Sequence, residues 1–240
     1  VVSLFFHVGA DGRLGGLIFY DANDFALVMV VTIPFAVYFV GKEHRSSRRI
    51  AALISLAMFL TAMVKSGSHL IIMAYNEFTT DVPEHSHLKP KDYWDARARG
   101  LGGSETDPVC SCGEENLLCF AGDPYSTENI LIHEFAHNIH LRGVIRVDPT
   151  FDTRLKKAYD DAMKNGLWKG KYASTNHHEY FAEGVQSWFD NNRENDHDHN
   201  HVNTRVELLE YDPGLAAMCK EVFGDTELRD KFRTLAGTVL

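Results

Sequence analysis

Residues 126–141 read STENILIHEFAHNIHL, and this stretch decides how the rest of the chain is interpreted. Apolar side chains recur along it every three to four residues, at Ile132, Phe135, Ala136 and Ile139. This spacing is typical of a helix that is buried on one side. Ser126 or Thr127 is a suitable N-cap, and Gly143 lies just past the expected end. The stretch therefore predicts an amphipathic helix.

The same helix carries the pattern H-E-x-x-H, formed by His133, Glu134 and His137. A spacing of four residues brings both imidazoles to one helix face, where they suit two ligands of one tetrahedral zinc ion. Glu134 is then placed to act as the general base on the attacking water. The alternative is a pair of incidental surface histidines. The metal site is favoured because His133 and His137 border the buried face of a capped helix.

A zinc site of this kind needs a third protein ligand. Residues 172–183 read YASTNHHEYFAE and supply several candidates in a segment that is expected to be helical. Glu179 and Glu183 are four residues apart and share a face, so either could offer a carboxylate. His177 and His178 directly precede Glu179 and are expected to point to other faces. The residues alone leave the choice of ligand open.

Taken together, the two stretches resemble the catalytic domain of the anthrax lethal factor family, the ATLF-like gluzincin metallopeptidases. The resemblance extends over residues of about 69–223. It rests on H-E-x-x-H at 133–137 and Y-x-x-T-N-x-x-E-Y-F-A-E at 172–183, with RARGLGG at 97–103, EENLL at 114–118 and YDP at 211–213 as weaker blocks. It implies an α+β, zincin-like metallopeptidase domain that is mainly helical with a small sheet.

The resemblance also implies roles for individual residues. By position, Glu179 is the third zinc ligand beside His133 and His137. The hydroxyl of Tyr172 supports the reacting carbonyl oxygen, and Glu183 accepts hydrogen bonds behind the ligands without touching the metal. The cofactor implied is Zn²⁺.

The function expected is that of a zinc-dependent endopeptidase, with a peptide or protein as substrate and Glu134 as general base on a metal-activated water. A catalytically silent zinc-site binding module is the first alternative. Intact Glu134 and Tyr172 count against it, because binding alone requires neither. A membrane glycan-ligase fragment, in which the peptidase domain is incidental, is the second.

That second alternative comes from residues 1–68, which differ in composition from the rest. Two runs without a charge, 25–40 and 50–64, flank a basic loop at 42–49. The positive-inside rule assigns such a loop to the cytoplasm and both ends of the hairpin to the outer face. We therefore predict an apolar helical hairpin that associates with a membrane through residues 17–64. Both runs are shorter than the roughly 20 residues that span a bilayer, so a pair of buried core helices is the alternative.

Residues 12–68 also resemble part of the O-antigen ligase and polymerase family of membrane proteins. The resemblance rests on RLGG at 13–16, DAND at 21–24 and SGS at 66–68. Proteins of that family have many more spans than two, so the segment would be a membrane fragment. No ligase chemistry is implied for it.

The metallopeptidase domain is expected at residues 69–240, outside the cytoplasm. Residues 1–68 carry six basic and four acidic side chains, whereas 69–240 carry 18 and 29. A surface this acidic excludes nucleic acid as a partner, because phosphate binding needs a basic footprint. Four cysteines in an outward-facing domain predict two disulfides in preference to a structural zinc site.

Further elements follow from local patterns. Residues 69–75 are expected to form a short buried strand, and a long irregular stretch follows at 79–124. Residues 192–203 are expected to be a solvated loop rather than a metal-binding run. Further helices are expected at 149–165, 176–191, 204–209, 215–223 and 226–236.

Overall fold

The computed structural model describes residues 6–8, 14–16 and 68–226. The chain divides into two units, Val1–His69 and Leu70–Leu240, and each is described by itself.

The described part of the first unit is a short antiparallel ribbon. Strand β1 (Phe6–Val8) pairs with β2 (Leu14–Gly16). The helical hairpin predicted at 17–64 lies outside the described residues. Among the residues that are described, no helix is both long enough and apolar enough to cross a membrane.

The second unit is mainly helical with a small mixed sheet, which confirms the general fold prediction. The sheet contains β3 (His69–Met73), β5 (Val109–Gly113) and β4 (Gly100–Leu101), in that order. Strands β4 and β5 are antiparallel, with Gly100 opposite Cys112. The strand predicted at 69–75 is present, but of its residues only Met73 is buried.

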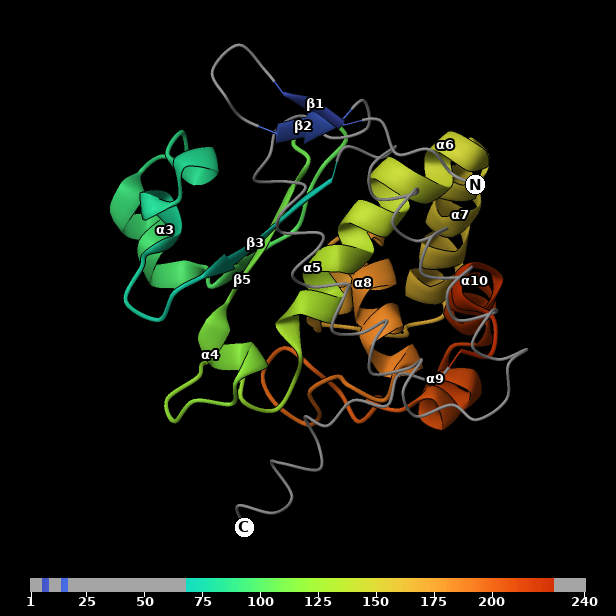
Figure 1. The fold of residues 1–240 in the computed structure, drawn as a ribbon. Coiled ribbons are helices and arrows are strands. Elements are labelled where there is room, and N and C mark those ends of the chain that lie inside the picture. Colours follow the sequence, from blue (N-terminus) through green and yellow to red (C-terminus); the bar gives the residue numbers. More distant parts are fainter. Residues whose placement is uncertain (1–5, 9–13, 17–67, 227–240) are drawn as a thin grey trace, which may run out of the picture. The chain divides into compact units, whose positions relative to one another are not determined.

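Helices make up most of this unit (Figure 1). The α-helices are α3 (Lys91–Arg97), α4 (Glu114–Leu117), α5 (Ile130–Asn138), α6 (Ile145–Val147), α7 (Phe151–Lys164), α8 (His177–Trp188), α9 (Arg205–Tyr211) and α10 (Pro213–Phe223). The 3-10 helices are η1 (Thr79–Asp81), η2 (Pro83–His85) and η4 (Tyr172–Ser174), and η3 (Ile139–Val144) is a π-helix that continues α5.

The predicted helices between 149 and 223 are present with small shifts of their ends. The prediction of an irregular structure at 79–124 is wrong. That stretch contains η1, η2, α3 and α4 together with β4 and β5. Elements of two to seven residues carry too little periodicity to be recognised from sequence, because their stability comes from tertiary contacts. The helix predicted at 226–236 falls almost entirely beyond the described residues.

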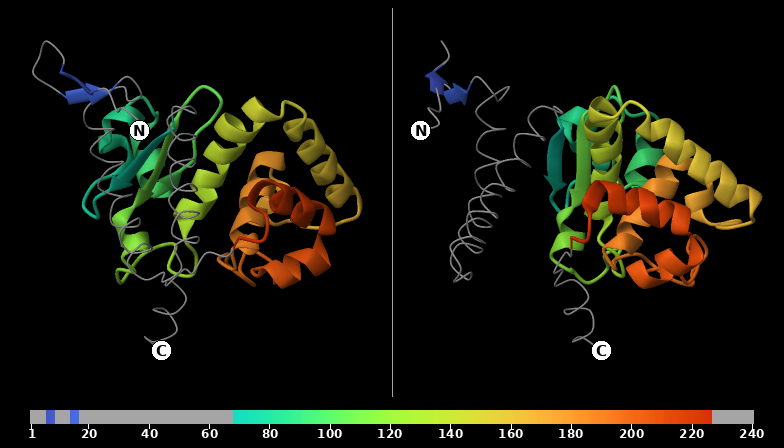
Figure 2. Two further views of the ribbon diagram at one scale, coloured as in Figure 1. Left: turned by 45° about the vertical axis from the view of Figure 1, so that its right-hand side comes forward. Right: turned by 90° about the vertical axis from the view of Figure 1, so that its right-hand side faces the viewer.

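Helix α8 lies at the centre of the second unit. It packs against α5, α7, α9, α10 and η4, and every residue from Tyr180 to Trp188 is buried. Gly184 permits close contact with α10, because a Cβ there would lie 2.6 Å from the Leu215 side chain. Figure 2 shows α5 between the sheet and α8, in agreement with the contacts of α5 on both sides.

A buried carboxylate joins α8 to α10. Asp212 caps α10 by accepting from the Leu215 backbone N–H at 3.0 Å. Its other oxygen accepts from the Tyr180 hydroxyl at 2.7 Å and from the Trp168 indole N–H at 2.8 Å. A buried acceptor with three donors is satisfied, so α10 is held firmly against α8.

The expectation of two disulfides is wrong. Cys110, Cys112 and Cys219 are free buried thiols. Cys219 belongs to the hydrophobic core, far along the chain from the other two. Burial raises the pKa of Cys112 to about 12 and that of Cys110 well above its usual value. These three thiols therefore behave as small core residues.

Candidate metal centre

Two asparagines define the start of α5. Asn129 is the N-cap, and its side-chain oxygen accepts from the Leu131 N–H at 3.1 Å. The side chain of Asn116 accepts from the Ile130 N–H at 3.0 Å. The predicted caps, Ser126 and Thr127, are therefore wrong by two to three residues, because a partner far away in sequence satisfies one of the free N–H groups of the first turn.

Helix α5 carries His133, Glu134 and His137, and all three side chains are buried. The two imidazole rings have centroids 5.1 Å apart. They lie on the face of α5 that meets α8, as the spacing of four residues predicts.

Helix α8 supplies the third member of the group, and its N-cap places it. The side-chain oxygen of Asn176 accepts from the N–H groups of His178 and Glu179, at 2.8 and 3.0 Å. An N-cap asparagine contributes typically about 1 kcal/mol to helix stability. The Glu179 carboxylate points toward α5, where it contacts His133 and His137.

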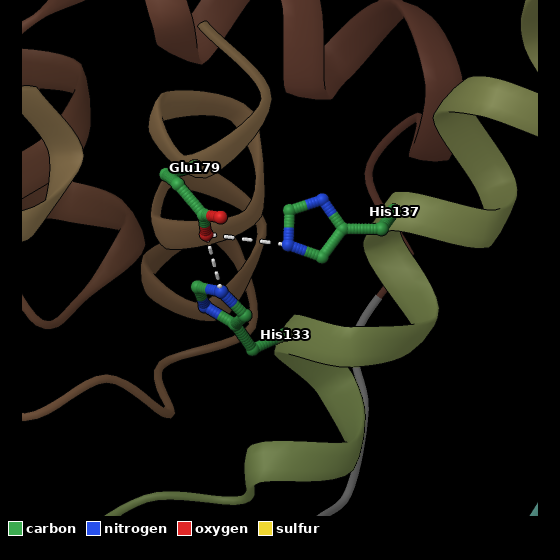
Figure 3. A group of neighbouring side chains, drawn as sticks. All are labelled: His133, His137 and Glu179. Carbon is green, nitrogen blue, oxygen red and sulfur yellow. Dashed lines mark hydrogen bonds and ion pairs between the residues drawn. The ribbon is translucent and has the colours of Figure 1, made fainter. Parts of the chain in front are cut away.

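The Glu179 carboxylate meets both imidazoles (Figure 3). One of its oxygens lies 3.0 Å from Nε2 of His133 and 3.3 Å from Nε2 of His137. One ligand atom from each residue lies within 4.8 Å of the others. Two imidazole nitrogens and a carboxylate oxygen are a donor set that zinc and related ions accept. The three residues can therefore hold a metal ion.

Burial and charge act against each other at this group. Burial raises the pKa of Glu179, but hydrogen bonds from His133 and His137 outweigh it, and the pKa lies well below its usual value. Burial likewise lowers the pKa of His133, and contacts with Glu179 and Glu183 reverse this and raise it. The carboxylate is thus held as an anion beside the imidazoles.

A second layer of side chains orients the His133 ring. Its Nδ1 lies 2.8 Å from the side-chain oxygen of Gln186 and 3.3 Å from a carboxylate oxygen of Glu183. A donor at Nδ1 leaves Nε2 free for a metal, which is how supporting residues set the tautomer of a histidine ligand. Glu183 therefore lies behind the ligands, whereas Glu179 lies among them.

Gln186 is a functional residue that the sequence interpretation missed. Its amide nitrogen donates to Glu128 at 2.8 Å, and Glu128 is paired with Arg193 at 2.6 Å. Gln186 follows Glu179 by seven residues on α8, so it shares the face of Glu179 and Glu183. That spacing was a usable signal for a polar residue on the metal-facing side.

The loop at 192–203 is not simply solvated. His199 is buried, with Nε2 3.5 Å from Glu183 and Nδ1 2.8 Å from Asp196. Burial lowers the pKa of His199, but these two carboxylates raise it to about 9. Burial raises the pKa of Glu183, and hydrogen bonds from His133 and His199 lower it to about 2. The loop thus supports Glu183 from the side opposite His133.

Glu134 points into a cavity of about 430 Å³, a size typical of ligand sites. The cavity wall includes His133, His137, Glu179 and Tyr172. Burial raises the pKa of Glu134 above its usual value. The residues that the sequence selected thus share one cavity.

Tyr172 belongs to η4, just before α8. Its ring centroid lies 6.0 Å from that of His133, and its backbone N–H donates to the Asp198 carbonyl at 2.8 Å. Burial, followed by the charge of Glu179, raises the pKa of Tyr172 to about 12. The hydroxyl therefore keeps its proton at neutral pH and can donate it in a hydrogen bond.

The glycines at 100, 102 and 103 lie directly against side chains of α5. A Cβ at Gly100 would lie 2.9 Å from a carboxylate oxygen of Glu134, and one at Gly102 would lie 2.5 Å from the His137 ring. The Gly103 N–H donates to the Asn138 side chain at 2.6 Å. Only glycine permits this backbone to approach the site so closely.

His177 and His178 lie on other faces of α8 than Glu179, as the sequence predicts, although His178 also forms part of the cavity wall. His177 Nε2 lies 3.0 Å from an oxygen of Asp152 on α7, and the His178 ring packs against His140 with centroids 5.3 Å apart. His140 is fully buried, and burial together with the neighbouring His178 lowers its pKa to about 4. The structure thus gathers a second set of histidines next to the first.

Comparisons with protein-family models, with curated proteins and with solved structures found no match for this chain. Its function is therefore inferred from its own residues.

Proposed function

We propose that this protein is a zinc-dependent endopeptidase with His133, His137 and Glu179 as its metal ligands. The observation that carries the proposal is the meeting of these three side chains beside Glu134 in one cavity. A binding module would need the ligands alone, whereas a hydrolase also needs a base and a donor beside them.

The donor set fits the cation. Three protein ligands of nitrogen and oxygen type, with an open side toward a cavity, are the usual arrangement of a catalytic zinc site. A bound zinc ion would supply Lewis-acid chemistry, polarising a carbonyl oxygen and lowering the pKa of a water molecule. In the gluzincin class that the sequence resembles, a glutamate on a second helix completes the H-E-x-x-H pair.

The side chains around this group have complementary roles in peptide hydrolysis. Glu134 accepts the proton of the attacking water and later delivers it to the leaving amine. Its raised pKa makes the carboxylate a stronger base for the first of these two transfers. Tyr172, whose hydroxyl stays protonated, donates a hydrogen bond to the oxyanion that develops on the substrate carbonyl. Glu183 and Gln186 hold the His133 ring in its ligating orientation.

Proteolysis of a peptide library by the purified full-length chain, kept in detergent, tests the proposal. We expect cleavage that stops with a chelator, returns with added zinc and is nearly absent in Glu134→Gln. Zinc binding without cleavage of any peptide would instead support the binding module. Cleavage that survives the chelator would contradict the metal mechanism.

We also propose that residues 17–64 attach the protein to a membrane, with the peptidase domain outside the cytoplasm. The support is the pair of uncharged runs around a basic loop. The cysteines give the outward placement no support, since Cys110, Cys112 and Cys219 are free thiols. Fractionation of cells that express the full chain tests the attachment. Recovery of the chain in the soluble fraction would contradict it.

A further inference from the structure

A second group of metal-binding side chains lies where η3, α7 and α8 meet. It consists of His140 from the π-helix, Asp152 from the first turn of α7 and His178 from the first turn of α8. His178 and Glu179 are neighbours on α8, about 100° apart around the helix axis. They therefore face two different groups, and only Glu179 reaches the first one.

The distances are those of a ligand set. One oxygen of Asp152 lies 3.0 Å from Nε2 of His140 and 3.9 Å from Nε2 of His178. One ligand atom from each of the three residues lies within 4.8 Å of the others. Imidazole nitrogens with a carboxylate suit zinc and its transition-metal neighbours, whereas calcium and magnesium prefer oxygen ligands alone.

The His140 ring supplies an independent observation. It is fully buried between aromatic rings, with centroids 5.6 Å from Phe151 and 5.4 Å from Phe181. Within the described part of the chain, neither of its ring nitrogens makes a hydrogen bond, although Nε2 lies 3.0 Å from Asp152. A buried polar atom without a hydrogen bond is destabilising and calls for an explanation. An ion between His140 and Asp152 would satisfy the ring nitrogen.

Access and support for an ion are both present. The side chains of Asp152 and His178 are 42% and 36% exposed, so an ion can enter from solvent while His140 closes the buried side. His177 Nε2 lies 3.0 Å from the same Asp152 oxygen. A hydrogen bond from His177 would orient the carboxylate, as residues behind metal ligands commonly do.

We propose that His140, Asp152 and His178 form a second binding site for a divalent ion of the zinc class. The site shares no ligand with the proposed catalytic one and does not rest on that function, although His178 also lines the cavity of the first group. An ion there joins η3, α7 and the first turn of α8, the turn that also carries Glu179. Its contribution is to hold these three elements together.

Zinc stoichiometry of the full-length chain tests this site. The protein is stripped with a chelator, equilibrated with zinc and analysed by elemental mass spectrometry. We expect two ions per chain in the wild type, one in the double variant Asp152→Asn/His178→Gln and one in His133→Gln/His137→Gln. The combination of all four changes should leave none. Asp152→Asn/His178→Gln binding as many ions as the wild type would overturn the proposal.

Controls separate this result from other effects. Asp160→Asn with His197→Gln removes an exposed aspartate of α7 and an exposed histidine, and should keep both ions. Failure of the proposed catalytic site would appear as no loss of zinc in His133→Gln/His137→Gln. The zinc content of Asp152→Asn/His178→Gln would still test the second site independently.

A second measurement covers the case in which the double variant does not fold. In the His133→Gln/His137→Gln protein, zinc should raise the thermal midpoint of unfolding, since a ligand that binds only the folded state stabilises it. His178→Gln in that background should abolish the shift, and His177→Ala should weaken zinc binding by roughly 10–100-fold. An unchanged zinc-induced shift in the His178→Gln protein would contradict the site.

Discussion

The two histidine groups of this protein use the same kinds of ligand in different surroundings. Each combines two imidazoles with one carboxylate, and each draws on α8 and on the α5–η3 helix. The first has polar side chains behind His133, the Glu134 carboxylate beside it and a cavity in front. The second has a buried imidazole without hydrogen bonds from the described residues, packed against phenylalanines. The surroundings, and not the kinds of ligand, distinguish the proposed catalytic site from the proposed second site.

The largest expected effect is that of Glu179→Ala. Among the described residues, it removes the carboxylate that meets both imidazoles of the first group, so the first ion and all activity should be lost, while the second ion stays bound. Zinc content and peptide turnover are the measurements, with the exposed Glu210→Ala as control. A zinc-replete, active Glu179→Ala protein would refute the gluzincin assignment and return His177, His178 or Glu183 to candidacy.

Glu134→Gln is expected to separate binding from chemistry. It removes the base and leaves all three ligands, so turnover should fall by about 10²–10⁴-fold with two ions still bound. Turnover and zinc content are measured on the same preparation. Normal turnover would show that another group transfers the proton. Loss of zinc would show that Glu134 is needed for metal binding.

Tyr172→Phe removes one hydrogen-bond donor from the cavity wall. Turnover should fall by about 10²–10³-fold with zinc retained, the range for deleting one oxyanion donor. Tyr159→Phe is the matched control, because its hydroxyl donates to the Ser174 carbonyl outside the cavity. Equal activity losses in the two variants would point to folding rather than to catalysis.

Gly102→Ala tests how closely the segment that follows β4 approaches the first group. Its Cβ would collide with the His137 ring, and a displaced ligand should lower activity by about 10²-fold. Gly143→Ala in η3 is the control, because a Cβ there would meet no described atom within 4 Å apart from its chain neighbours and the backbone of its own helix. Activity is compared by kinetic assay of both variants. Unchanged activity of the Gly102→Ala protein would show that the segment after β4 can shift without displacing His137.

The smallest effect is expected for Glu183→Ala. The carboxylate supports His133 and His199 from behind, so metal affinity or activity at the first site should fall by roughly 10–100-fold. Zinc titration of this variant beside Glu179→Ala ranks the two glutamates. If Glu183→Ala were the more damaging change, Glu183 would be the ligand.

The parts of the site that sequence predicted are those that depend on neighbours along the chain. The spacing of His133 and His137 places both rings on one helix face in any α-helix. The asparagine cap of α8 is local as well, which is why the start at Asn176 was predicted correctly. Choosing Glu179 over Glu183 required a family resemblance, because the rotation of α8 against α5 is not a local property.

The parts that sequence did not predict depend on distant contacts. Gln186 reaches His133 across 53 positions of the chain, and Asn116 caps α5 from 14 positions upstream. His199 is buried with its Nε2 3.5 Å from a carboxylate oxygen of Glu183, which lies 16 positions earlier in the chain. Cys110 and Cys112 are buried in β5 and Cys219 is buried in α10, which the spacing of the cysteines along the chain did not indicate.

By itself, the sequence determined two amphipathic helices, the histidine pair on one and the carboxylates on the other. Helical periodicity and capping act within a few residues, so these features follow from local chemistry. Only the tertiary structure decided which carboxylate meets the imidazoles, which amide orients His133 and that His140, Asp152 and His178 come together. Those outcomes depend on how packed helices are rotated and spaced, which many weak contacts across the whole domain determine.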